Sequence, residues 1–427
     1  MLLAKSLERP KEIVFCLLAF FLPFPYIFAP PLIVCLVILW LITLKPGQLY
    51  HNFKERKVLW IWLAYFFLFA ISYTYSYNKK QSLFDLQSKL CFIIMPLVIG
   101  AGGPILKKML ERILFYFSIG VTCIALFCMI RSYIIWHQTH YTLILFYNNL
   151  TKGFDQNAVY EALYAIFSII SLLVFPWEDH FKKNKIFKIL LVLIQLSFFI
   201  LLSSRTLLVL FVLIIIPVFI RQAHKINKLV TLSILFSLAA FLFFLFTTQN
   251  PIKHRYMEIV HTENGKIELR HDTTIYNFNN LTLRLFLWKT GIGNIRKHNL
   301  WWIGAGNGDA QDIQNKKFSE YSAVDTNIVN PLLNLNMHNM YLQSLIMVGI
   351  PGLILFIMLV FSPFLYIKYN ELGSLILIFN LIACIFMIQE SSFQTQAGII
   401  YYSFFSMLFW NYYYSKKDDA KKVQNAR

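Results

Sequence analysis

Long apolar runs alternate with short polar segments along the whole chain. Most of the runs cover about 17 to 25 residues, the length that an α-helix needs to cross a hydrocarbon layer about 30 Å thick. We therefore predict an all-α, polytopic integral membrane protein that forms a single membrane domain over residues 1–427. The pattern predicts about twelve spanning helices, near 13–29, 31–45, 58–77, 90–106, 113–136, 159–177, 186–203, 206–220, 230–247, 340–361, 373–388 and 397–414.

One apolar run, ILLVLIQLSFFILLSSRTLLVLFVLIIIPVFI, is too long for one upright helix and slightly short for two. Basic residues flank it on both sides, and such residues are concentrated on the cytoplasmic side of membrane proteins. A hairpin that turns at Ser203–Thr206 keeps both basic clusters on that side, whereas a single span would separate them. We therefore predict the hairpin, with its turn on the outer face.

The same rule predicts the orientation of the whole chain. The basic clusters, including those within 5–11, 54–57, 107–112 and 416–422, all fall on the cytoplasmic side, so both termini are expected there. The longest hydrophilic segment, residues 248–338, then forms a large and partly helical loop on the outer face. It contains the amphipathic stretch LTLRLFLWKTGIGNIRKHNLWWIG, and we expect Leu283, Phe286 and Leu287 to rest this stretch on the membrane surface.

Composition excludes several other classes of protein. With 58% hydrophobic and only 14% charged residues, the chain does not have the composition of a soluble globule. The net charge of +18 comes from short basic clusters between apolar runs, so we expect no nucleic-acid partner. The six cysteines include no Cys-x-x-Cys pair, which argues against a disulfide framework and a thiolate metal site.

Two arginines adjoin apolar segments on the predicted outer side. Arg205 lies in the hairpin turn, where an arginine costs less than the about 2.5 to 3.5 kcal/mol expected at the centre of a spanning helix. Its planar fork of donors suits a phosphate or pyrophosphate, and the alternative is an arginine that snorkels to the lipid headgroups. Arg284, in TLRLFLWK, either points into a cavity or is an ordinary arginine of an amphipathic helix.

Polar residues gather where MHNMYLQSL leads into an apolar run. We expect His338 to begin a helix with Asn336 as its N-cap, so that the helix dipole favours the neutral imidazole that a general base requires. A purely structural histidine is the alternative. Asn339 and Gln343 either orient a polar ligand or bond the loop, and Tyr341 follows on the helix face as a further supporting residue.

A carboxylate at the outer end of the eleventh predicted span, Glu390 in MIQESSFQTQ, either supports this site or bonds a neighbouring helix.

Two glycine motifs have structural interpretations. GAGNGD, residues 304–309, lacks the strand, turn and helix of a dinucleotide site, so a tight turn or anion-binding nest is favoured. The proline and glycines of Gly349–Gly352 are expected to serve helix packing.

Absent motifs also narrow the chemistry. The outer loop contains no His-Glu-x-x-His, no Asp-x-Asp and no serine nucleophile elbow. Metalloproteases, metal-dependent glycosyltransferases and serine hydrolases are therefore disfavoured. We expect neither a metal nor a cofactor.

The second half of the chain resembles the superfamily of bacterial O-antigen ligases and polymerases. The resemblance rests on SSRT between two apolar segments, on RLFLWKTGI and WWIGAGNG in the long loop, and on HNMYLQSLIMVGIPG, and it covers roughly residues 190–400. It implies an inverting, metal-independent glycosyltransferase of the bacterial inner membrane that acts on the periplasmic side. His338 would be the general base, and Arg205 and Arg284 would bind the donor pyrophosphate.

The implied donor is a glycan on an undecaprenyl pyrophosphate carrier, and for a ligase the implied acceptor is lipid A-core. A polymerase would instead add repeat units to a growing glycan, and relatives with the same motifs glycosylate pilins. A secondary transporter, embedded in the same membrane lipids, is the alternative from another class. It would predict two similar halves, whereas the polar motifs here are concentrated in the second half. We therefore favour an O-antigen ligase.

Overall fold

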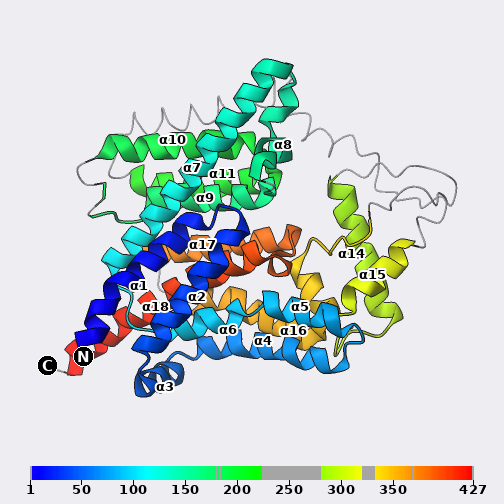
Figure 1. Cartoon of the computed structure of the whole chain (residues 1–427), viewed down its shortest axis with the longest axis horizontal. Coiled ribbons are helices and arrows are strands. Elements are labelled where there is room, and N and C mark those ends of the chain that lie inside the picture. Colours follow the sequence, from blue (N-terminus) through cyan, green and yellow to red (C-terminus); the bar gives the residue numbers. More distant parts are fainter. Residues whose placement is uncertain are drawn as a thin grey trace.

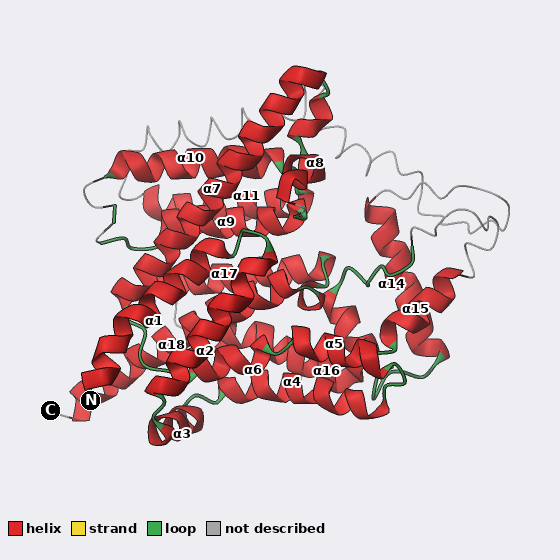
Figure 2. Cartoon of the chain, viewed as in Figure 1, coloured by secondary structure: helices red, strands yellow, loops and turns green. Residues whose placement is uncertain are grey.

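Helices form all the regular structure in the described part of the chain (Figures 1 and 2). The computed structural model describes residues 2–425 apart from 155, 179, 182–183, 224–279, 320–331 and 368–369. The predicted all-α class is confirmed for these residues. The predicted span at 230–247 and much of the loop 248–338 lie outside them.

The N-terminal helices are α1 (Leu2–Phe21), α2 (Ala29–Thr43), α3 (Pro46–Glu55) and α4 (Val58–Tyr75). The first helix begins before the predicted span at 13–29 and ends before Pro23 and Pro25, because a proline lacks the N–H that continues a helix. The next helix carries prolines at its first positions, where that N–H has no helical partner.

The next group of elements contains α5 (Lys79–Ser88), α6 (Cys91–Met95), a π-helical turn (Pro96–Gly100), α7 (Lys107–Thr139), α8 (Tyr147–Thr151), α9 (Ala158–Val174), α10 (Lys185–Leu201) and α11 (Arg205–Ala223). Leu202, Ser203 and Ser204 separate the last two helices, and Ser203 has a left-handed φ of 51°. The break predicted at the hairpin turn is therefore confirmed.

The C-terminal elements are α14 (Asn280–Lys297), α15 (Ala310–Ser319), α16 (Met340–Tyr366), α17 (Glu371–Gln389), the 3-10 turn Ser392–Gln394 and α18 (Gln396–Asn425). In Figure 1, α17 and α18 run through the middle of the molecule. Helices α4, α5, α6 and α16 lie on one side of them, and α7, α9, α10 and α11 lie on the other. The pair α14 and α15 lies at the end away from both chain termini.

Six helices among the described residues are long and apolar enough to cross a membrane. They are Tyr26–Thr43, Val58–Tyr75, Lys79–Gly100, Lys107–Thr139, Met340–Tyr366 and Leu372–Gln389. The bent pair Tyr147–Phe154 and Ala158–Val174, which turns by 92°, makes a seventh if it is one span. The chain is thus a multi-pass membrane protein, and the number twelve stays a prediction.

An aromatic core joins the two sides of the bundle through α17 and α18. Tyr402 of α18 stacks on Trp62 of α4 at 5.7 Å between ring centroids and on Phe379 of α17 at 5.8 Å. Phe405 of α18 packs edge to face against Phe167 of α9 at 4.9 Å. Ring pairs at these separations add to the stabilisation from apolar burial, so α17 and α18 are held from both sides.

Helix α16 is broken at Val348 and Gly349, and the glycine motif of the long loop packs into the break. Gly349 has a φ of 69°, and a Cβ atom there would lie 2.4 Å from the carbonyl oxygen of Trp302. The N–H of Ala305 donates to the carbonyl of Ile346 at 2.8 Å, and that of Gly306 donates to Met347 at 2.9 Å. The packing role predicted for the Gly-Ile-Pro-Gly motif is therefore confirmed.

The polar residues of GAGNGD bind α4 and α5. The side-chain oxygen of Asn307 accepts hydrogen bonds from Ser72, at 2.9 Å, and from Ser76 and Ser82. The carboxylate of Asp309 accepts the backbone N–H groups of Tyr77 and Asn78, at 2.6 and 2.7 Å. The motif is therefore a turn that fastens two helices to α16, as the tight-turn interpretation expected.

The amphipathic stretch in the long loop is helical, but its large apolar side chains face protein. Phe286 and Leu287 of α14 are buried against Phe318 of α15 and against Leu332. The expectation that these two residues rest on the membrane surface was wrong, because α15 supplies an apolar surface that sequence periodicity does not reveal.

Candidate active site

His338 lies immediately before α16 and not inside its first turn. The helix begins at Met340, and its N-cap is Asn339, whose side-chain oxygen accepts the N–H of Leu342 at 3.0 Å. The prediction that Asn336 caps the helix was wrong. Asn336 instead accepts the backbone N–H of His338 at 2.8 Å and so stabilises the turn, in which His338 has a φ of 43°.

Met337, the residue before the histidine, is fixed by three helices. Its N–H donates to the side-chain oxygen of Gln343 in α16 at 3.1 Å, and its carbonyl accepts the indole N–H of Trp288 in α14 at 3.0 Å. Its sulfur lies 2.9 Å from the amide nitrogen of Gln314 in α15. Gln343 therefore bonds the loop, and α14 and α15 help to set the position of His338.

Asn339 and Tyr341 attach the start of α16 to the end of α17 and the turn after it. The backbone N–H of Asn339 donates to the hydroxyl of Ser391 at 3.0 Å. The Tyr341 hydroxyl donates to the carbonyl of Cys384 at 3.3 Å, and its ring packs on Phe356. Both residues thus support the site through helix contacts.

Glu390 joins the histidine to an arginine. One carboxylate oxygen lies 3.0 Å from Nδ1 of His338, and the other lies 3.0 Å from an Nη atom of Arg284. The carboxylate is nearly buried, whereas the imidazole and the guanidinium are about one quarter exposed, at 24% and 21%. Both interpretations of Glu390 therefore apply, because its carboxylate contacts His338 and also bonds Arg284 of a neighbouring helix.

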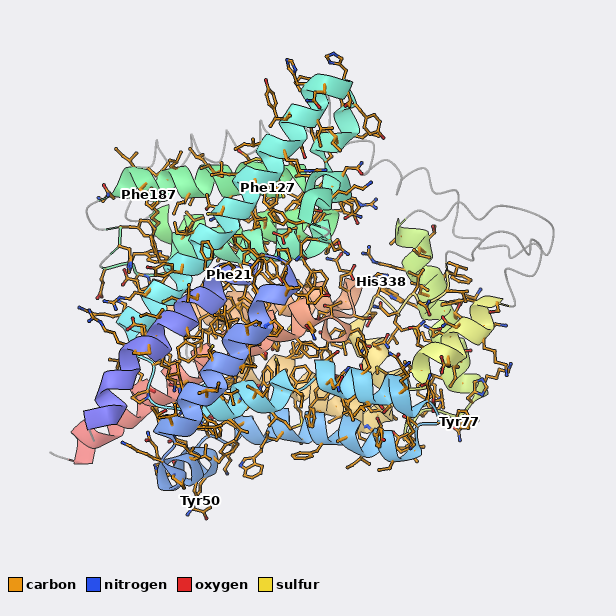
Figure 3. All side chains as sticks on the ribbon, viewed as in Figure 1. Phe21, Tyr50, Tyr77, Phe127, Phe187 and His338 are labelled. Atoms are coloured by element: carbon orange, nitrogen blue, oxygen red, sulfur yellow. The ribbon has the colours of Figure 1, made fainter. Side chains whose placement is uncertain are left out.

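The hydrogen bond with Glu390 also determines which ring nitrogen of His338 can act as a base. An ionised carboxylate only accepts hydrogen bonds, so Nδ1 carries the proton in this contact and Nε2 keeps its lone pair. A carboxylate in this position also stabilises the imidazolium that forms when Nε2 takes up a proton. Figure 3 shows His338 in the half of the molecule that contains α14 and α15, far from Tyr50.

Arg205 and Arg284 line one pocket, together with Tyr147, Val159, Ser204, Thr206 and Gln389. The pocket contains about 320 Å³ of space, including open solvent. Arg205 is the first residue of α11, where the unpaired amides of the helix add positive partial charge. Two guanidinium groups beside a helix N-terminus suit an anion such as a pyrophosphate.

The residues that line the pocket come from segments that are far apart in the sequence. Arg284 is held by its Nε atom, which donates to the carbonyl of Gln389 at 3.1 Å, in addition to its contact with Glu390. Tyr147 and Val159 come from the bent pair α8 and α9 in the first half of the chain. Sequence reasoning missed Tyr147, Val159 and Gln389, because no local motif marks them.

Glu390 thus connects His338 with Arg284, and Arg284 lines the pocket together with Arg205. Such a site can take a proton from a hydroxyl group while it stabilises an anionic leaving group nearby.

Comparison with sequence families found a match over part of the chain. Residues 190–357 match the sequence family described as O-antigen ligase. The match includes Arg205, Arg284 and His338 and ends before Glu390. Comparison with curated proteins gave no match.

Proposed function

We propose that this membrane protein is an O-antigen ligase, and the match of residues 190–357 to the sequence family described as O-antigen ligase supports this proposal. In this proposal it moves a glycan from undecaprenyl pyrophosphate to a hydroxyl group of lipid A-core, on the periplasmic side of the inner membrane. The observation that carries the proposal is the bridge made by Glu390. It holds the base, His338, and one pocket arginine, Arg284, in a fixed relation.

The reaction begins with the acceptor hydroxyl beside Nε2 of His338. As this nitrogen takes the proton, the acceptor oxygen attacks the anomeric carbon of the donor sugar. The bond from that carbon to the pyrophosphate oxygen breaks, and the carrier leaves with the bonding electron pair. Attack from the face opposite the leaving group in a single step inverts the anomeric configuration.

Negative and positive charge develop at two different places during this step, and the site has groups that stabilise each of them. Negative charge grows on the departing pyrophosphate, where Arg205 and Arg284 stabilise it. Positive charge grows on the imidazole of His338, where Glu390 stabilises it. The guanidinium groups supply the neutralisation that a divalent cation provides in other glycosyltransferases, so the proposed reaction is metal-independent.

The proposal is tested by reconstituting the purified protein in liposomes with a glycan on undecaprenyl pyrophosphate and with lipid A-core, in EDTA and without nucleotide. A single modified lipid band that requires lipid A-core is the expected result. A ladder formed from the donor alone would make the protein a polymerase of the same superfamily. No product with either acceptor, from folded protein, would contradict glycan transfer to these acceptors.

A further inference from the structure

Gln389 is a pocket residue to which the proposed chemistry assigns no role. It is the last residue of α17, it is half-buried, and it lines the pocket with Arg205 and Arg284. Its side-chain amide nitrogen is buried, and this nitrogen has no hydrogen-bond partner in the described part of the chain. A buried polar group without a partner is uncommon and calls for a specific explanation.

We propose that Gln389 is a donor-binding residue whose amide N–H donates a hydrogen bond to a phosphoryl oxygen of the carrier pyrophosphate. This inference rests on the proposed function and deepens it. An amide nitrogen can only donate, so it needs an acceptor. Beside two guanidinium groups, the acceptor that the pocket favours is an anionic oxygen, which forms stronger hydrogen bonds than a neutral one.

The backbone of the same residue supports this role. The Gln389 carbonyl accepts the Nε–H of Arg284 at 3.1 Å, so one residue orients a guanidinium and also contributes its own donor. The next residue, Glu390, has an extended backbone with φ of −142° and ψ of 137°. Gln389 lines the donor pocket, whereas the carboxylate of Glu390 contacts His338 and Arg284.

Glu390 does not compete for the same amide. Its two carboxylate oxygens lie 3.0 Å from His338 and from Arg284, and it is not among the residues that line the pocket. No other acidic side chain of the described residues lines the pocket either. A negative charge at position 389 would therefore face both the guanidinium groups and the bound pyrophosphate.

Two variants separate a donor-binding role from a packing role. Gln389→Met keeps an unbranched side chain of similar length and removes the amide, and Gln389→Glu replaces the amide with a charge that repels phosphate. We expect Gln389→Met to raise the KM for the undecaprenyl-pyrophosphate donor about tenfold, the effect of losing one hydrogen bond to a charged group. Gln389→Glu should raise it further, and neither variant should change the KM for lipid A-core.

A matched control is Gln394→Leu. Gln394 lies in the 3-10 turn after α17, its amide contacts the sulfur of Met347, and it does not line the pocket. This variant should keep the wild-type donor KM. The inference is overturned if folded Gln389→Met keeps the wild-type donor KM, if Gln389→Glu is no worse than Gln389→Met, or if the acceptor KM rises equally.

A binding measurement distinguishes failure of this inference from failure of the proposed function. Inorganic pyrophosphate is titrated into the purified wild-type protein and both variants, with thermal stability as the readout. We expect about tenfold weaker binding for Gln389→Met, and weaker still for Gln389→Glu. Equal binding by all three proteins overturns the role of Gln389. Weaker binding by the variants, with no glycan transfer by the wild type, overturns only the proposed function.

Discussion

Nδ1 of His338 lies 3.0 Å from a carboxylate oxygen of Glu390, across a contact between the start of α16 and the end of α17. The two residues are far apart in sequence, and each belongs to a short non-helical segment beside a helix. The contact sets the proton on Nδ1 and leaves Nε2 available as a base.

His338→Ala should reduce glycan transfer by about 10²-fold to 10⁴-fold, the usual contribution of a general base. Membrane insertion and the elution volume in gel filtration should not change, because the imidazole is partly exposed. The measurement is initial transfer rate in liposomes. His298→Ala, an exposed histidine after α14, is the control and should transfer normally. Normal transfer by folded His338→Ala would remove the histidine from the mechanism.

Arg205→Lys should impair transfer about 10-fold to 100-fold, although the charge is kept. Lysine is a point charge and loses the planar pair of donors that fits a phosphate. The effect should appear in the KM for the donor and in kcat, measured with varied donor. Arg296→Lys, on an exposed position of α14, is the matched control and should leave the donor KM and kcat unchanged. Wild-type kinetics for Arg205→Lys would favour the snorkelling interpretation.

Glu390→Gln should lower kcat by about 10²-fold, because the amide keeps the shape of the carboxylate but cannot stabilise an imidazolium by charge. The loss of its ion pair should also let Arg284 move, so the KM for the donor should rise. Initial rates at varied donor concentration give both constants. Glu390→Asp retains the charge and should recover part of kcat. If Glu390→Gln and Glu390→Asp were equally active, the charge would have no catalytic role.

Asn307→Ala should destabilise the protein, because the hydroxyl groups of Ser72 in α4, Ser76 just after α4 and Ser82 in α5 lose their common acceptor. A buried group left without its partner costs about 1 to 3 kcal/mol. We expect a lower thermal denaturation midpoint in detergent. Asn315→Ala removes hydrogen bonds at the exposed surface of α15 and should shift the midpoint less. An unchanged midpoint for Asn307→Ala would mean that the loop is not held by this contact.

Gly349→Ala should be strongly destabilising or prevent recovery of folded protein. The backbone at this position has a φ of 69°, and the new Cβ atom would lie 2.4 Å from the Trp302 carbonyl oxygen. The unfavourable φ and the clash with Trp302 cannot be relieved unless the break in α16 moves. Gly103→Ala, where nothing lies within 4 Å of the added atom, is the control. Fluorescence-detected gel filtration of both variants measures the difference, and equal recovery would contradict the close approach.

Much of the helical architecture is determined by the order of apolar and polar residues alone. A hydrocarbon layer requires helices with satisfied backbone groups, so runs such as those of α4, α7 and α16 are recognisable without tertiary information. The turn before Arg205 was also predictable, because the basic flanks allow only one economical topology. Arg205, Arg284 and His338 were identified because each places a polar group at an apolar border.

The relation between these residues was decided by tertiary structure. Glu390 bridges His338 and Arg284, and Tyr147 and Gln389 line the same pocket. Three helices hold Met337. Each of these contacts joins segments that have no regular spacing in the sequence. The N-cap of α16 and the burial of Phe286 were mispredicted for the same reason. Apolar periodicity determines that a helix has an apolar face, whereas the partner of that face depends on packing between distant helices.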